Sequence, residues 1–325
     1  SPFSKFEIKG VAAHSELQRI CTANIKNETG RSTYTQMLNK AGGIETDLTV
    51  ICIEENHFRI ISSAATRTHD KAHILKHLSP KLKLNDVTDK LVCLGIFGPK
   101  SRDLISKISK DNFSNDTLNF GRGKYTQICS KKVWAQRLSY VGELGFEIYI
   151  NNIDAKEIYE LIIKEGKNYK LSHCGSHAMD TMRMESGFLH WGHDISPEEN
   201  QYEAGLNFAI SYKKEIDFIG KESLLKIKNK KKDKRFVMLS LKDSGPGHPL
   251  LLHEEPIYLN NEIIGRTTSG NYSFNYKKNL SFGYINSKYC IEELMKKILY
   301  IEVAKKKHQA VVEVIPLKNK KARYS

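Results

Sequence analysis

The chain has 325 residues, enough for two or three domains with a sizeable buried core. Hydrophobic residues make up 40% and charged residues 27%, as in soluble globular proteins, and no apolar run approaches the roughly 20 residues of a membrane-spanning helix. The net charge of +14 comes mainly from lysines spread along the chain. Because arginines and aromatic residues are not interleaved on one element, the sequence indicates neither a nucleic-acid site nor a membrane partner.

The cysteines indicate the cellular compartment, and the start of the chain indicates how it relates to the full protein. The six cysteines are scattered without a Cys-x-x-Cys pair, which is typical of small buried side chains in a reducing compartment, so we expect a cytoplasmic protein. No secretion signal is visible, the first residue is not methionine, and residues 6–10 already have the pattern of a strand. We therefore expect the chain to be part of a longer protein.

The first two-thirds of the chain alternates short strands with helices. The expected strands are residues 48–53, 57–62, 91–97, 133–140 and 146–150. The expected helices are residues 68–78, a segment after Pro99, one with Asp154 as N-cap, and residues 176–187, capped by Ser176 and ended by Gly187. Strands in hairpins with helices between them are typical of an α+β fold.

The pattern of predicted elements changes after residue 225. The run KIKNKKKDKR, residues 226–235, is interpreted as a lysine-rich linker. Beyond it, short β runs alternate with turns, so residues 236–325 are predicted to form a separate small β-barrel domain. Residues 1–225 would form the larger α+β domain.

Two acidic residues draw attention because of their positions. Asp47 follows twin glycines in GGIETDLTV, residues 42–50, and Glu147 lies in SYVGELGFEIYI, residues 139–150, shortly after Tyr140. A glycine turn lets a backbone approach a ligand, and a strand holds an acid rigidly. However, glycine and aspartate are also common in ordinary turns, and a strand acid often faces solvent. The residues alone leave both interpretations open.

Other candidate motifs are weaker. FGRGKY, residues 120–125, does not complete a dinucleotide-binding fingerprint, so any redox domain would lie outside this chain. The two histidines of HWGHD, residues 190–194, lack further ligands at metal-site spacing, and no metal is expected.

Several segments taken together resemble the aminomethyltransferase superfamily, which includes the T protein of the glycine cleavage system. In chain order they are GRSTYTQMLNKAGGIETDLTV, SYVGELGFEIYI, AMDTMRMESGFLHWGHDISPEENQYEAGLNF, DFIGKESL and EPIYLNNEIIGRTTSGNYSFNYKKNLSFGYI. The segments HWGHD and ISPEENQYEAGL resemble the folate-binding C-terminal parts of dimethylglycine and sarcosine dehydrogenases more than they resemble the T protein. The resemblance covers nearly the whole chain.

This resemblance implies a three-lobed fold around a central tetrahydrofolate site, with two α+β lobes followed by the small β domain. By position, Asp47 matches the family's essential acid, and Tyr140 and Glu147 match the tyrosine and glutamate that hold folate. The other matching positions are Tyr34, a folate-contacting tyrosine, Phe208, an aromatic wall, and Arg235, an arginine associated with the site. One departure is Met179, which replaces the first arginine of the T-protein motif R-D-S-L-R-L-E.

The implied function is tetrahydrofolate-dependent one-carbon transfer, as the folate part of a dimethylglycine- or sarcosine-dehydrogenase-like enzyme that yields 5,10-methylene-tetrahydrofolate. Glu147 would accept hydrogen bonds from the amino-pyrimidine edge of the pterin, and Asp47 would accept a proton. The one-carbon donor would be an amine or its iminium, and FAD would be bound only by an upstream flavin dehydrogenase domain. The alternatives are a free-standing glycine-cleavage T protein or sulfonium demethylase, and a non-catalytic folate-binding regulatory protein.

Overall fold

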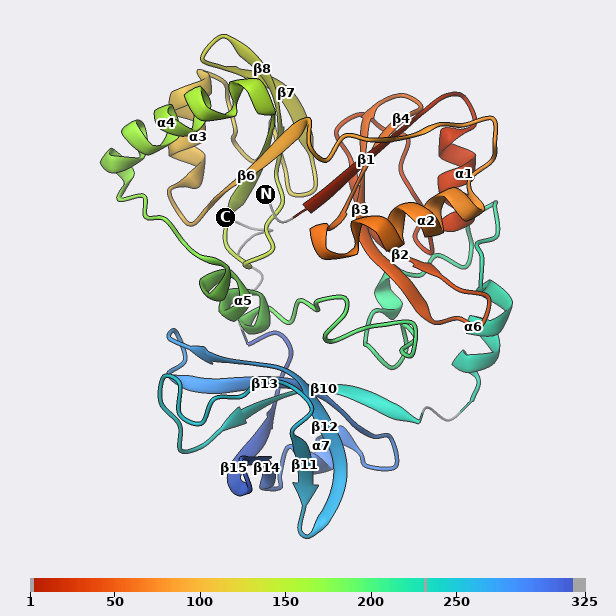
Figure 1. Cartoon of the computed structure of the whole chain (residues 1–325), viewed down its shortest axis with the longest axis vertical. Coiled ribbons are helices and arrows are strands. Elements are labelled where there is room, and N and C mark those ends of the chain that lie inside the picture. The colour runs from red at the N-terminus through yellow and green to blue at the C-terminus, as the bar shows by residue number, and fades with distance from the viewer. Residues whose placement is uncertain (1–2, 231–232, 318–325) are drawn as a thin grey trace.

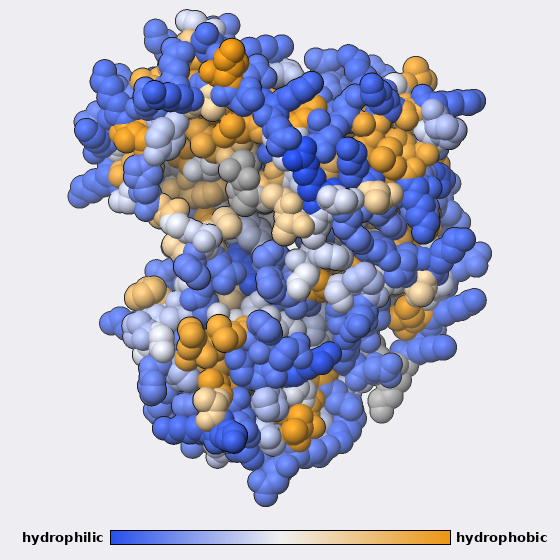
Figure 2. Space-filling view, in the orientation of Figure 1, coloured by the Kyte–Doolittle hydropathy of each residue, from blue (hydrophilic) through white to orange (hydrophobic). Residues whose placement is uncertain are grey.

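The computed structural model describes residues 3–230 and 233–317 and has three lobes arranged around a common centre (Figure 1). We call residues 3–86 the first lobe, residues 91–171 the second lobe and residues 234–313 the barrel. The face shown in Figure 2 is mostly hydrophilic and is hollowed at one edge between the second lobe and the barrel. Residues 231–232 of the expected linker and 318–325 of the expected barrel domain lie outside the described residues.

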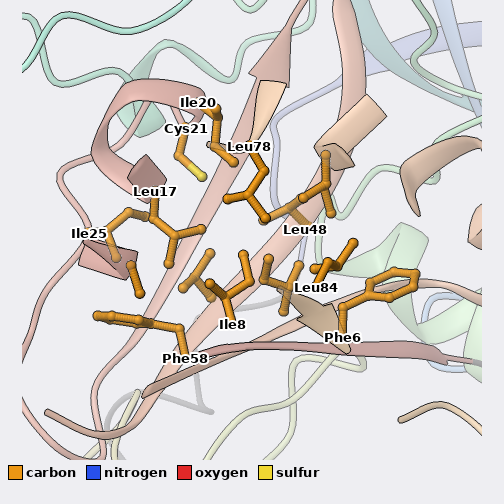
Figure 3. Packing of buried hydrophobic residues seen from close by; sticks show 14 of the residues in the cluster. Phe6, Ile8, Leu17, Ile20, Cys21, Ile25, Leu48, Phe58, Leu78 and Leu84 are labelled. Carbon is orange, nitrogen blue, oxygen red and sulfur yellow. The ribbon is translucent and has the colours of Figure 1, made fainter. Parts of the chain in front are cut away.

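The first lobe is an antiparallel sheet with helices on one face. Its strand order is β2–β3–β4–β1–β5. The elements are β1 (Phe3–Lys9), α1 (Ala13–Ile20), β2 (Ser32–Leu38), β3 (Ile44–Glu54), β4 (His57–Ser63), η1 (Ala64–Thr66), α2 (Arg67–His77) and β5 (Leu84–Asp86). Alternate strand residues such as Ile8, Leu48 and Phe58 pack against Leu17 of α1 in a fully buried core (Figure 3).

The second lobe repeats this plan with four strands in the order β6–β9–β8–β7. Its elements are β6 (Leu91–Phe97), α3 (Ser101–Ser109), β7 (Gly123–Ile128), β8 (Lys131–Gln136), β9 (Gly145–Asn151), η2 (Asn152–Asp154), α4 (Ala155–Gly166) and η3 (Lys167–Tyr169). Phe146 and Ile148 of β9 pack with Ile105 of α3 and Ile158 of α4. Because side chains alternate along a strand, Glu147 lies on the opposite face of this sheet.

The helix-free faces of the two sheets meet. Ile51 and Ile61 of the first lobe form a buried cluster with Cys93, Trp134 and Tyr149 of the second. The two lobes therefore form one unit, and residues on these facing surfaces can approach one another.

The barrel closes in the order β10–β13–β12–β11–β14–β15. Its elements are β10 (Lys234–Leu241), β11 (Pro256–Leu259), β12 (Glu262–Ser273), β13 (Lys278–Asn286), α7 (Ile291–Leu294), β14 (Leu299–Val303) and β15 (Lys306–Glu313). The connection from the second lobe contains α5 (Ser176–Glu185), η4 (Asn207–Ala209) and α6 (Lys221–Lys228). The expected α+β class with a small C-terminal β-barrel is confirmed.

Three local expectations were wrong. The strand expected over 133–140 ends at Gln136, because the next residue, Arg137, turns into a loop where its guanidinium donates to the carbonyl of Leu118. Ser176 is the first residue of α5 and makes no capping hydrogen bond; Gly175 occupies the N-cap position. The cysteines are not all buried, since Cys174 and Cys290 are exposed. In the described part of the chain, no helix is long and apolar enough to cross a membrane.

Candidate functional site

Asp47 lies on β3 opposite Gln36 of β2. The Nε2 atom of Gln36 donates a hydrogen bond to Oδ1 of Asp47 at 2.7 Å. Burial raises the pKa of Asp47 from 3.8 to about 6, although hydrogen bonds from Gln36 and Tyr34 act in the opposite direction. Because this pKa is still below neutrality, Asp47 is mostly ionised at pH 7 and can accept a proton.

Tyr34 and Phe208 form an aromatic wall beside Asp47. Their rings stack with centroids 6.1 Å apart and an interplanar angle of 20°. Burial and the Asp47 carboxylate raise the pKa of Tyr34 well above its ordinary value, so this side chain remains a neutral phenol that can donate a hydrogen bond. Phe208 lies in η4 and is 71% exposed, which leaves its ring surface available to a ligand.

Tyr140 lies in the loop between β8 and β9. Its hydroxyl donates to the carbonyl of Leu189 at 2.9 Å, and its ring stacks on Phe188 with centroids 6.0 Å apart. Burial is the main cause that raises the pKa of Tyr140, and the negative charge of Asp47 contributes. That contribution indicates that Tyr140, although it belongs to the second lobe, lies in the electrostatic neighbourhood of Asp47.

Glu147 lies on the face of β9 that is turned toward the first lobe. The Tyr149 hydroxyl donates to Oε2 of Glu147 at 2.6 Å, and within the described part of the chain no hydrogen bond is made to Oε1. Burial raises the pKa of Glu147, while the Tyr149 hydrogen bond opposes this. Asp47 and Ile51 are four residues apart on β3, so their side chains lie on the same face of the sheet. Ile51 packs with Tyr149 of the second lobe. The two acids therefore occupy the two sheet faces that meet between the lobes.

Arg235 is not brought to this group. Arg235 lies on β10 and has the same sheet face as Val237 and Leu239, which lie in the barrel core. The pKa of Glu292 is lowered by a hydrogen bond from Cys290 and also by the charge of Arg235, which places Arg235 near α7. The structure thus brings together Tyr34, Asp47 and Phe208, with Tyr140 of the second lobe in the electrostatic neighbourhood of Asp47. Glu147 lies on the facing sheet beside Tyr149 and Cys93.

The sequence reasoning missed a buried ion pair beside these residues. Arg183 of α5 donates to Oδ2 of Asp194 at 2.5 Å, and both side chains are almost fully buried. Thr268 of β12 donates to Oδ1 of Asp194 at 2.6 Å, so the pair ties α5 and the 188–206 loop to the barrel. The sequence marks both residues, Arg183 in the segment that resembles R-D-S-L-R-L-E and Asp194 in HWGHD, but no local pattern pairs them.

The two histidines of HWGHD lie close together. The rings of His190 and His193 have centroids 4.7 Å apart. Within residues 3–230 and 233–317, no group of three His, Cys, Asp or Glu side chains is arranged to hold a metal ion.

Comparison with known protein families agrees with this architecture. The GCVT N-terminal domain matches residues 1–214, and the glycine cleavage T-protein C-terminal barrel domain matches residues 234–317. The chain belongs to the glycine cleavage T-protein family. This is a family of folate-dependent aminomethyltransferases, so the expected resemblance is confirmed and a transferase is supported.

Individual members of the T-protein family match most of the chain. The 4-methylaminobutanoate oxidase (formaldehyde-forming) of Paenarthrobacter nicotinovorans is 36% identical over 273 residues, 84% of this chain and 33% of that protein. The mitochondrial dimethylglycine dehydrogenase of Rattus norvegicus is 33% identical over 290 residues, 88% of this chain and 33% of that protein. The aminomethyltransferase of Anoxybacillus flavithermus is 30% identical over 288 residues, 88% of this chain and 78% of that protein.

A solved structure supports the fold of the family. The glycine cleavage system aminomethyltransferase T from Bartonella henselae has a TM-score of 0.87 at 22% identity, covering 100% of this chain and 86% of that one. The chain spans about a third of the length of the oxidase and dehydrogenase relatives.

Proposed function

We propose that the chain binds a reduced folate between the first and second lobes and supports one-carbon transfer to it, as the folate part of a dimethylglycine- or sarcosine-dehydrogenase-like enzyme. The observation that supports this most is the position of Asp47 next to Tyr34, whose ring stacks on Phe208, with Glu147 on the facing sheet. A flavin dehydrogenase would act as the partner and supply the oxidised donor. The dehydrogenase relatives, in which the matching segment is a third of a longer protein, favour this arrangement.

The residues present fit a pterin. A buried carboxylate with one oxygen free of hydrogen bonds among the described residues, as in Glu147, is suited to accept the N–H donors of an amino-pyrimidine edge. The exposed ring of Phe208 and the ring of Tyr34 offer aromatic surface nearby. When bound, tetrahydrofolate would supply the nucleophilic nitrogen that takes up the one-carbon unit.

The chain's own residues would orient, take up a proton and exclude water. Asp47, ionised at neutral pH, would accept the proton released during transfer, and such positioned base catalysis is typically worth about 10²- to 10⁴-fold. Tyr34 would hold the carboxylate by its hydrogen bond. The aromatic side chains would limit the access of water to a hydrolysable one-carbon electrophile.

Two measurements on the Asp47→Asn variant test the proposal. Calorimetry with tetrahydrofolate should show binding to the wild type and to the variant, because the variant keeps the acceptor for Gln36. Formation of 5,10-methylene-tetrahydrofolate, in the presence of a dimethylglycine-oxidising flavin enzyme, should fall about 10²- to 10⁴-fold. A wild type that binds no folate, or a variant with unchanged product formation, would refute the proposal.

A second candidate is a free-standing aminomethyltransferase. It is favoured by the aminomethyltransferase of Anoxybacillus flavithermus, which is matched over 78% of its length. Transfer from an aminomethyl group carried on a lipoyl protein, without any flavin enzyme, would favour this candidate over the first.

A further inference from the structure

Gln201 is distant in sequence from Asp47 but is connected to it by two amide groups. Its Nε2 atom donates to Oε1 of Gln36 at 2.5 Å and to the hydroxyl of Thr22 at 3.1 Å. Nε2 of Gln36 in turn donates to Oδ1 of Asp47 at 2.7 Å. Gln36 and Gln201 are both fully buried, so water does not compete for these contacts.

The direction of each hydrogen bond follows from the ionised carboxylate. A carboxylate can only accept, so Gln36 must turn its NH₂ group toward Asp47. Its carbonyl oxygen then faces Gln201, which must present its own NH₂ group. The Gln201 donor and the Asp47 carboxylate therefore favour the same orientation of the Gln36 amide.

An unpaired atom shows how firmly this orientation is set. In the described part of the chain, the buried Oε1 atom of Gln201 has no hydrogen-bond partner. A buried acceptor without a partner is unfavourable, so the contacts made by Nε2 of Gln201 must favour this orientation. Rotating the amide by half a turn would bring this oxygen against the oxygen of Gln36, which is less favourable still.

We propose that Gln201 is a positioning residue that acts through Gln36 to keep Oδ1 of Asp47 as a hydrogen-bond acceptor, so that a proton taken up by Asp47 resides on Oδ2. The catalytic consequence rests on the proposed function, whereas the orientation itself does not. The titratable groups that face Asp47 from neighbouring elements are Tyr34 on β2, Asp70 on α2, Tyr140 in the loop before β9, and Glu45 with its partner His69.

The test is a carboxyl ¹³C NMR titration of Asp47 in the folate-free protein, with Asp47→Asn used to assign the signal. Gln201→Met and Gln36→Met both remove a donor while keeping a linear side chain. Gln36→Met should raise the apparent pKa of Asp47 by about one unit, because a hydrogen bond to the charged form is lost. Gln201→Met should raise it by a smaller amount, because the Gln36 amide loses the donor that holds its NH₂ group toward Asp47. The double variant should match Gln36→Met alone, since Gln201 acts only through Gln36.

Gln18→Met is the matched control. Gln18 is also a buried glutamine of the first lobe, but it donates to Asn24 and to the carbonyl of Ile25. This variant should lose stability without moving the Asp47 titration. If Gln201→Met does not fold, Gln201→Asn, whose shorter amide cannot reach Gln36, replaces it.

Two results would overturn the inference: a wild-type Asp47 titration in the Gln201 variant, or a further rise in the double variant over Gln36→Met. If the proposed function holds as well, the acid limb of kcat/KM moves upward by the same amount in the Gln201 variant. If the NMR shift appears without any transfer activity, the proposed function fails and the positioning role stands.

Discussion

At the scale of single residues, the protonation of Asp47 links stability to pH. Its pKa is about 6 in the folded protein against an ordinary 3.8, so between these pH values the folded state holds a proton that the unfolded chain has released. Stability therefore falls as pH rises through this window. Relative to Asp47→Asn, the free energy of unfolding of the wild type should increase by about 2 kcal/mol when pH is lowered from 7 to 4.5.

Urea unfolding at the two pH values measures this difference. At pH 7 the Asn variant should be the more stable protein and the less active one, because the charge that burial disfavours is the charge proposed to accept the proton. A variant less stable than the wild type at pH 7 would contradict the raised pKa.

Glu147→Gln tests the proposed pterin acceptor. Replacing one carboxylate oxygen by NH₂ removes a charge-assisted acceptor, so the Kd for tetrahydrofolate should rise about 10- to 100-fold. Glu160→Gln, on the exposed face of α4, is the control and should bind as the wild type does. Equal affinities for the wild type and Glu147→Gln would exclude this role.

The sequence allows prediction of residues at this scale only where a pattern marks them. Asp47 after twin glycines and Glu147 between buried strand residues can be selected from the sequence, and the resemblance added Tyr34, Tyr140 and Phe208. Gln36 could have been found, because it is two residues after Tyr34 on the same face of a strand. Gln201 could not, since its contact with Gln36 joins positions 165 residues apart.

At the scale of elements, Lys214 holds the segment that carries Phe208. Its ammonium group donates to the carbonyls of Gln18, Cys21 and Ala23 at the end of α1. Lys214→Met keeps the aliphatic stem and removes these charged hydrogen bonds, each of which is typically worth about 1.5–3 kcal/mol. We expect a higher KM for folate with kcat little changed, because η4 loses its anchor. Lys213→Met, at an exposed neighbouring position, should leave steady-state kinetics unchanged.

Periodicity predicts elements well when one face is buried. The helix expected over 68–78 is observed as α2, residues 67–77, with Ile74 in the core. The next residue, Leu75, is 49% exposed, since one residue turns a helix by about 100° and moves the side chain off the buried face. The expected strand after Gln136 failed because an apolar run gives no information about the loop that receives Arg137.

At the scale of the whole molecule, the Arg183–Asp194 pair joins the segment after the second lobe to the barrel. Arg183→Met leaves the carboxylate of Asp194 buried and uncompensated, which should lower the free energy of unfolding by about 3–5 kcal/mol. The double variant Arg183→Met/Asp194→Asn should recover part of this loss. Arg266→Met breaks the half-exposed pair with Glu254 and should cost less than about 1 kcal/mol in urea unfolding. Equal losses for the two single arginine variants would contradict the assigned role.

The assembly of the lobes could be predicted only through the family resemblance. Arg183 meets Ser269 across 86 residues of sequence, and no local pattern announces such a contact. Composition and periodicity indicated an α+β domain followed by a β domain. The position of the barrel relative to the two α+β lobes depends on these long-range polar contacts.

The closed barrel has a consequence for association. Each described strand from β10 to β15 is hydrogen-bonded on both sides, as β10 is to β13 and β15, whereas β6, an outermost strand of the second lobe, is paired with β9 on one side. Strand addition by a neighbouring polypeptide needs a free row of backbone N–H and C=O groups. A companion protein that approaches the barrel must therefore recognise side chains, while the rim of the second lobe at β6 leaves main-chain groups open to strand addition.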